Sequence, residues 1–238
     1  MAFDKILWVV NYDKLSDFVA EASAAKVTGV AIRTDNDLDA AITAFHAKNI
    51  KVYGWRWPSA KEDAAMKEAA KAVALFGKGL DGYYVDPEGE KGKPYDWDLP
   101  GLGPLAAKFS QTIANAAAGK PYGVTSHYRG KAQHKNLPWA EFFQHATVLL
   151  PQAYWRVEGG VVGHGDPADN YAQALKFWKA TGGKLERIKP MAGEIAFAKP
   201  AEINAYAAAA AANHVSELHF YTATDTVKPA VWAAIAAL

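Results

Sequence analysis

The chain has 238 residues, half of them hydrophobic, so it is long enough to bury one large core. Its 26 lysines and arginines nearly balance its 25 aspartates and glutamates, which leaves no strong electric field to attract nucleic acid or an anionic membrane. No apolar run approaches the roughly 20 residues needed to cross a bilayer, and the absence of cysteine excludes disulfides and thiolate chemistry. We expect one domain, residues 1–238, with no nucleic-acid or membrane partner.

Strand-like and helix-like segments alternate along the whole chain. The strand candidates are short apolar runs without two-residue alternation, which is typical of strands covered on both faces. In chain order they are residues 5–11, 29–34, 51–57, 82–86, 122–127, 147–154, 187–192 and 217–222. Amphipathic helical patterns fill the intervals between them.

Several helices carry recognisable end signals. These are a capping box of Ser59 and Glu62, an N-cap and first-turn proline at Asp166 and Pro167, and a stop at Gly182 and Gly183. The alanine block 207–212 continues a pattern that starts at Pro200, so we expect a helix there rather than disorder. A last helix is expected over residues 229–238.

Eight strand–helix units at a spacing of about 30 residues predict a single closed (β/α)8 TIM barrel. An open, doubly wound sheet is the alternative topology. In a barrel the chemistry lies on the loops that follow the strands, so the end of each strand can be searched for functional side chains.

The strand ends argue against several kinds of chemistry. Metal-dependent hydrolase barrels place histidines or carboxylates on several strands, whereas the first and third strands end in Asn11 and in Arg56-Trp57. We therefore expect no metal and no cofactor. The segment after the last strand lacks the glycines of a phosphate-binding loop. Ser126 and His127 are adjacent in a strand and point to opposite faces, which disfavours a serine hydrolase.

The fourth strand runs into the carboxylates of "DGYYVDPEGE", residues 81–90. Tyr84, Asp86 and Glu88 alternate, so their side chains should point together toward the barrel axis and its mouth. Mutual repulsion and burial raise the pKa of one carboxyl group, which then stays protonated near neutral pH and can protonate a glycosidic oxygen. We assign Glu88 as general acid and Asp86 as charge stabiliser. The alternative is a solvated, charged turn.

A second set of side chains completes the expected site. Glu194, after the seventh strand, is a reserve nucleophile, because two carboxylates about 5 Å apart build a retaining site. Aromatic rings with polar tips suit the apolar face of a pyranose. The expected substrate-binding residues are Trp57, Arg56, Tyr84, His127, Gln152, Tyr154, Trp155 and Tyr221. The remaining histidines are expected to be surface or satisfied interior residues: His46, His134, His145, His164, His214 and His219.

"DGYYVDPE" is similar to the D-G-x-D-x-D-x-E signature of family 18 chitinases and related N-acetylglucosaminidases. Asp81, Asp86 and Glu88 match that signature, and Tyr84 stands where an acid is expected. The resemblance implies that Tyr154, in "LLPQAYW", binds the N-acetyl group of the substrate.

The layout also resembles glycoside hydrolase family 25, the muramidase-type lysozymes. In that family an Asp-x-Glu pair ends strand four, and "VYGWRWP" is similar to its G-x-Y-H-F third strand. Asn11 stands where the family has an aspartate, and Arg56 or Trp57 stands at the histidine position. Both families cleave β-linked N-acetylated glycans, which implies a peptidoglycan or chitin-like substrate.

The leading hypothesis is thus a glycosidase acting on a polysaccharide of β-linked N-acetylhexosamine. One alternative is a glycan-binding barrel without catalysis, and another is an unrelated TIM-barrel lyase or isomerase whose small acidic substrate is held by Arg33 and Arg56. The chain shows no signal-peptide pattern. We expect a monomer synthesised in the cytoplasm, which acts in recycling there, is released by lysis, or is delivered by a phage or a secretion system.

Overall fold

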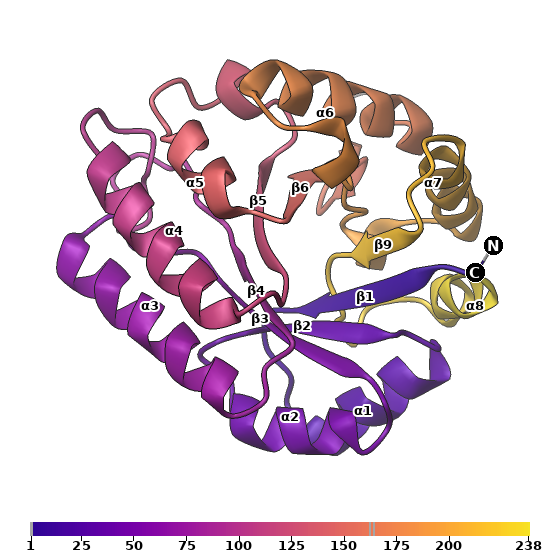
Figure 1. Ribbon diagram of the computed structural model, residues 1–238. Helices are drawn as coiled ribbons and strands as arrows, with labels where there is room; N and C mark the ends of the chain where they lie inside the picture. Colours follow the sequence, from indigo (N-terminus) through magenta and orange to yellow (C-terminus); the bar gives the residue numbers. More distant parts are fainter. Residues whose placement is uncertain (1, 162, 164) are drawn as a thin grey trace.

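The computed structural model describes residues 2–161, 163 and 165–238. Figure 1 shows a central ring of parallel strands surrounded by helices. The regular strands, with spatial order β6-β5-β4-β3-β2-β1-β9, are β1 (Asp4–Val9), β2 (Gly29–Arg33), β3 (Lys51–Arg56), β4 (Gly82–Val85), β5 (Tyr122–His127), β6 (Val148–Gln152) and β9 (Glu217–Phe220). The helices are α1 (Leu15–Ala24), α2 (Leu38–His46), α3 (Glu62–Gly77), α4 (Gly103–Ala117), α5 (Trp139–His145), α6 (Pro167–Thr181), α7 (Pro200–Ala212) and α8 (Pro229–Ala237).

The segment 188–192, the seventh expected strand in chain order, lies between β6 and β9 and completes the ring. It makes parallel bridges to both neighbours: Leu149 with Ile188, Gln152 with Met191, and Ala192 with Phe220. Two prolines, Pro151 and Pro190, supply no N–H there, so the ladder is interrupted and no regular strand forms. The (β/α)8 barrel is confirmed, and its expected seventh strand is present as isolated bridges.

The helix ends agree with two of the three sequence signals. Asp166 caps α6 by accepting from the backbone N–H groups of Ala168 and Asp169, and Gly182 ends that helix with a φ of 111°. The capping box of Ser59 and Glu62 is wrong, because α3 begins at Glu62 itself. The Ser59 N–H instead donates to the Glu68 carboxylate at 2.9 Å. The alanine block lies within α7, as expected.

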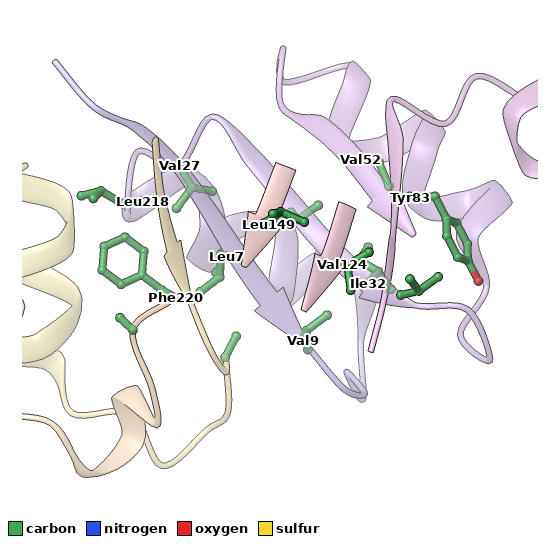
Figure 2. Packing of buried hydrophobic residues seen from close by; sticks show 14 of the residues in the cluster. Leu7, Val9, Val27, Ile32, Val52, Tyr83, Val124, Leu149, Leu218 and Phe220 are labelled. Atoms are coloured by element: carbon green, nitrogen blue, oxygen red, sulfur yellow. The ribbon is translucent and has the colours of Figure 1, made fainter. Parts of the chain in front are cut away.

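The core has two layers, because successive side chains of a strand point to opposite faces. One layer lies between the strands and the helices, and Figure 2 shows several of its members, among them Leu7, Ile32 and Val124. The other layer fills the barrel interior with mostly large side chains: Ile6, Trp8, Ala31, Tyr53, Trp55, Tyr84, Val148, Leu150 and Met191. The interior is therefore packed, and any ligand must bind at a mouth of the barrel.

A buried polar chain crosses part of this interior. The Trp8 indole donates to His219 Nδ1 at 3.0 Å, which leaves His219 Nε2 to donate to Glu217 at 2.9 Å. Lys189 pairs with the same carboxylate at 2.9 Å. Hydrogen bonds and charges from His219 and Lys189 outweigh burial and lower the pKa of Glu217 to about 2. This series of hydrogen bonds and ion pairs satisfies polar groups that would otherwise be costly to bury.

A short hairpin, β7 (Arg156–Val157) with β8 (Gly160–Val161), follows β6 and was not expected. Arg156 fixes it to α7 by pairing with Glu202 at 2.6 Å. Among the described residues, no helix combines the length and apolar character required to cross a membrane.

Candidate active site

Asp86 and Glu88 lie just beyond the end of β4, where the chain leaves the ring of strands. The Asp86 N–H donates to the Arg56 carbonyl at 2.9 Å, and the Glu88 carbonyl accepts from the Trp97 N–H at 2.7 Å. The backbone on both sides of the pair is thus tied down. Asp86 is only 5% exposed, which excludes a solvated turn at this residue.

Gln152, at the end of β6, brings the two carboxyl groups together. Its Nε2 donates to Asp86 at 3.0 Å for Oδ1 and 3.2 Å for Oδ2, and it reaches Glu88 Oε1 at 3.4 Å. One amide group therefore faces both acids. An amide N–H stabilises a negative charge, so this contact favours the pair carrying one shared charge.

Both acids hold a proton more strongly than free carboxyl groups do. Burial, and then the Glu88 charge, raise the pKa of Asp86 well above its usual range. Burial also raises the pKa of Glu88, but hydrogen bonds from Asp86 and Gln152 oppose that rise. Both pKa values are therefore raised, as the sequence predicts for a pair that keeps a proton near neutral pH. Because the two carboxyl groups are buried together and interact, they favour a state in which the pair holds one proton. The assignment of Glu88 as general acid and Asp86 as charge stabiliser stays a prediction.

An aromatic wall stands beside the acid pair. Tyr154 and Tyr221 stack with ring centroids 5.4 Å apart and planes at 12°. Burial is the largest cause that raises the pKa of both phenols, and the charges of Asp86 and Glu88 contribute to both shifts. Gly193 permits this arrangement, because a Cβ at that position would lie 2.5 Å from the Tyr154 ring.

Trp57 is half-buried beside the same pair. A side-chain hydrogen bond between Trp57 and Asp86 opposes the rise in the pKa of Asp86. Tyr95 stacks on the indole at 6.2 Å, and the Arg33 guanidinium lies 5.4 Å from its ring centroid. The ring is therefore held by its neighbours in a fixed orientation.

A pocket of about 270 Å³ borders the site. It is lined by His127, Tyr128, Arg129, Gln152, Tyr154, Val157 and Gly163. Gln152 also contacts both acids, so the pocket opens next to them. A larger cavity of about 520 Å³ is formed by β1, α1 and residues 223–225, away from the acid pair. Size alone therefore does not identify the site, and we place it where the acids and the smaller pocket meet.

Tyr84 and Trp155 are corrections to the expected substrate-binding set. Tyr84 does point to the barrel axis, but it is buried in the interior, between Trp8 at 5.1 Å and Tyr53 at 5.2 Å. Trp155 is completely buried, and its indole donates to Glu202 at 3.2 Å. Neither ring is available to a ligand.

Arg56 is also turned away from the acid pair. In β3 the inward positions are taken by Tyr53 and Trp55, so Arg56 points to the helix side, where it pairs with Asp35 at 3.1 Å and lies 3.8 Å from Glu68. Arg33 pairs with the same Asp35 at 2.6 Å. Both arginines are thus engaged in ion pairs, which argues against a small acidic substrate held between them.

Glu194 is half-buried after segment 188–192. Burial raises its pKa, a backbone hydrogen bond from Glu158 lowers it, and the Glu158 charge raises it. Its charge also contributes to the raised pKa values of Tyr154 and Tyr221, so it lies near these two phenols. Its role as a nucleophile stays a prediction.

Sequence reasoning missed His134, which approaches Glu88 with Nε2 3.9 Å from Oε2. The sequence predicts a surface or satisfied interior residue there, because His134 has no ligand spacing. The one available signal was Gly89, since a glycine beside a functional residue can mark close approach of another group. A Cβ at that position would lie 2.1 Å from His134 Nδ1. His164 lies outside the described residues.

Among the described residues, no three histidine, aspartate or glutamate side chains form a group able to hold a metal ion. The acids of the site instead face an amide, two phenols and an indole. This arrangement can bind and release a proton and can stabilise a neighbouring positive charge.

The sequence matches no protein-family model and no curated protein sequence. Solved structures do share the fold. A family GH18 chitinase from Cycas revoluta in complex with allosamidin aligns with a TM-score of 0.70 at 10% identity, over 99% of both chains. A class V chitinase from Pseudomonas fluorescens Pf-5 aligns with a TM-score of 0.63 at 12% identity, over 98% of both chains.

An α-galactosidase from Thermus thermophilus in complex with stachyose aligns with a TM-score of 0.61 at 12% identity. The alignment covers 99% of this chain and 64% of the galactosidase, so the chain spans less than two thirds of that protein. At these identities the likeness shows a shared fold: the chain is a (β/α)8 barrel of the kind also found in chitinases. The resemblance to family 25 stays a prediction from the sequence.

Proposed function

We propose that the protein is a glycosidase that cleaves β-linked N-acetylhexosamine polymers, with Glu88 as general acid and Asp86 as charge stabiliser. The observation that carries this proposal is the pair of raised-pKa carboxyl groups joined by Gln152 at the barrel mouth. Perturbed acids in a partly enclosed site are the usual signature of proton-transfer catalysis. The chitinases that share the fold support the substrate class.

A pair that holds one proton can both donate that proton and stabilise positive charge during cleavage of the glycosidic bond. Positive charge that develops on the sugar, or on a participating N-acetyl group, stabilises the anionic form of Asp86. As the glycosidic bond breaks, Glu88 donates the proton of the pair to the leaving oxygen, and Asp86 is anionic beside the developing charge. The Gln152 amide stabilises whichever carboxyl group carries the charge at each stage.

The Tyr154–Tyr221 wall and the pocket next to Gln152 supply the binding surface. Flat rings with polar tips bind the apolar face of a pyranose, and their hydroxyl groups orient its polar substituents. The Tyr154 hydroxyl is the proposed partner of the N-acetyl group. Because a participating N-acetyl group replaces a protein nucleophile, Glu194 is needed only if the enzyme forms a covalent intermediate.

A glycan-binding barrel without catalysis is the second candidate function. Tyr84 favours it, because this buried phenol replaces the acid that the family 18 signature places beside the pair. Without that acid, one negative charge that would tune Asp86 is missing.

Digestion of purified peptidoglycan and of chitin, followed by mass analysis of the new chain ends, tests the proposal. We expect new reducing ends from the wild-type protein and a loss of about 10³-fold or more in Glu88→Gln, as for removal of an essential proton donor. Lys131→Gln, an exposed charge change in the loop after β5, is a matched control that should keep full activity. Glycan binding with no chain ends released by the folded wild type would establish the binding barrel instead.

A further inference from the structure

His134 is a buried side chain that the structure places against Glu88. It follows the 3-10 turn η1 (Gly130–Ala132) after β5, and its backbone N–H donates to the Gly130 carbonyl at 3.0 Å. Its Nε2 lies 3.9 Å from Glu88 Oε2, and only 8% of the residue is exposed. The separation exceeds a direct hydrogen bond, so the two groups interact through space or through one bridging water.

Asp98 faces the other nitrogen of the same ring. Its Oδ2 lies 4.0 Å from His134 Nδ1, and its Oδ1 accepts from the Asn136 N–H at 2.6 Å, which holds the carboxylate in place. An anion beside Nδ1 favours the tautomer that carries hydrogen on Nδ1. The lone pair of Nε2 then faces Glu88, so the three groups are ordered Asp98, His134, Glu88.

The ring of His134 has little freedom to move away. Its backbone carbonyl accepts from the buried Trp139 indole at 2.9 Å. The imidazole packs directly on Gly89, and its edge meets the ring of His127 with centroids 6.1 Å apart. The orientation toward Glu88 is therefore built into the fold.

The charged and titratable groups around the imidazole come from three segments. They are Glu88 after β4, Asp96 and Asp98 before α4, and His127 at the end of β5. Burial lowers the pKa of His134, and Asp98 and Asp96 only partly oppose this, so the ring is neutral at pH 7. Burial, followed by the charges of His134 and Arg129, lowers the pKa of His127 to about 4, so it is neutral as well.

We infer that His134, oriented by Asp98, is a positioning residue for the acid pair: it shields Glu88 from water and presents a neutral acceptor that keeps Glu88 a proton donor. The inference rests on the proposed role of Glu88 as general acid. A neutral acceptor stabilises the protonated carboxyl group, whereas a cation at the same place would stabilise the carboxylate. The alkaline limb of the pH–rate profile, where the pair loses its proton, should therefore depend on the charges of His134 and Asp98.

The test is the dependence of kcat/KM on pH for the full chain acting on chitooligosaccharides and on peptidoglycan. In His134→Lys we expect the alkaline limb to move about one pH unit or more to lower pH, because unit charges about 4 Å apart interact strongly enough to do so. Asp98→Asn should move it in the same direction by less, since it removes an anion from the surroundings. His134→Gln keeps an uncharged acceptor and should keep the wild-type limb.

Carboxyl ¹³C NMR titration of Glu88 and Asp86 in the same variants gives a readout that needs no activity. If the wild type cleaves neither polymer but the carboxyl titrations shift in His134→Lys and Asp98→Asn, the result would support the coupling of His134 to the acids and refute the proposed reaction. Identical limbs and identical carboxyl titrations in all variants of an active enzyme would overturn the inference. If His134→Lys does not fold, Asp98→Asn alone decides between these outcomes, because its side chain keeps the shape and an acceptor oxygen of Asp98.

Discussion

The side-chain amide of Gln152 donates to both carboxylate oxygens of Asp86, at 3.0 and 3.2 Å. Asp86 directly follows β4 and Gln152 ends β6, on either side of β5, so the contact crosses the mouth of the barrel. It joins the Gln152 amide, which has no titratable proton, with Asp86, an acid whose pKa is raised by burial. This contact is what makes the acid pair a defined chemical unit.

Gln152→Leu should therefore lower kcat more than it raises KM. A hydrogen bond to a charged group is worth about 1.5–3 kcal/mol, which corresponds to a loss of roughly 10- to 150-fold. Loss of the donor should also raise the apparent pKa of the pair, so the alkaline limb should move to higher pH. Steady-state kinetics across pH measures both effects, with circular dichroism as the check on folding. Unchanged kcat in the folded variant would contradict the role given to Gln152.

Tyr154→Phe tests whether the aromatic wall orients the substrate. Its ring still stacks on Tyr221, so the fold and the apolar platform are kept. Loss of the hydroxyl group removes a hydrogen bond worth about 1 kcal/mol or somewhat more, so we expect kcat/KM to fall roughly 5- to 20-fold. Tyr128→Phe is the matched control, because Tyr128 lines the same pocket. Equal effects of the two changes would argue against a specific contact from Tyr154.

The sequence was sufficient for the architecture, because strand–helix alternation is a repeated signal to which every segment contributes. It also predicted that Asp86 and Glu88 lie on one face, since two-residue alternation fixes which side chains share a face, and Gln152 contacts both of them. It could not show how deep the interior packing reaches along a strand. Tyr84 points inward as expected, yet it lies within the packed layer rather than above it.

His134 and Trp155 show a second limit. Their positions depend on how the loops after β5 and β6 return over the barrel, and no periodicity encodes that path. The loop after β5 carries His134 to Glu88, whereas the loop after β6 buries Trp155 against Tyr206, with ring centroids 5.8 Å apart. A search for functional side chains directly after each strand therefore selects Trp155, which is a core residue, and overlooks His134, which borders the site.

Trp155→Phe should consequently affect stability and leave substrate binding unchanged. The smaller ring leaves a cavity and removes the indole hydrogen bond to Glu202, so we expect a loss of about 1–3 kcal/mol in the free energy of unfolding. Urea denaturation measures the loss, and KM for chitooligosaccharides measures binding. A large rise in KM with unchanged stability would return Trp155 to the substrate-binding set.

Gly89→Ala tests the close approach of His134. A Cβ at this position would lie 2.1 Å from His134 Nδ1 and 2.9 Å from Asp98 Cβ, so the imidazole must shift. We expect a loss of about 1–3 kcal/mol in stability, the usual range for overpacking, together with reduced activity. Gly77→Ala, at the end of α3 with no atom within 4 Å of the added Cβ, is the control and should be neutral or slightly stabilising. Wild-type stability and activity in Gly89→Ala would show that the ring does not need this position.

The buried chain of Trp8, His219, Glu217 and Lys189 predicts how stability depends on pH. The pKa of Glu217 is about 2 in the folded protein, against 4.5 for the unperturbed group, so its ionised form favours folding. This stabilisation is fully present above pH 4.5 and is lost as the pH falls toward 2. Burial also lowers the pKa of His219, so protonation of that ring in acid destabilises the fold in the same direction.

Glu217→Gln should therefore lower the free energy of unfolding by about 2–3 kcal/mol at pH 7, and the difference from wild type should shrink as the pH falls below 4.5. Urea denaturation at a series of pH values measures this directly. Glu186→Gln, an exposed change on the turn after α6, is the control and should parallel wild type throughout. A constant difference between Glu217→Gln and wild type from pH 7 to pH 3 would mean that Glu217 stabilises the barrel by packing rather than by its charge.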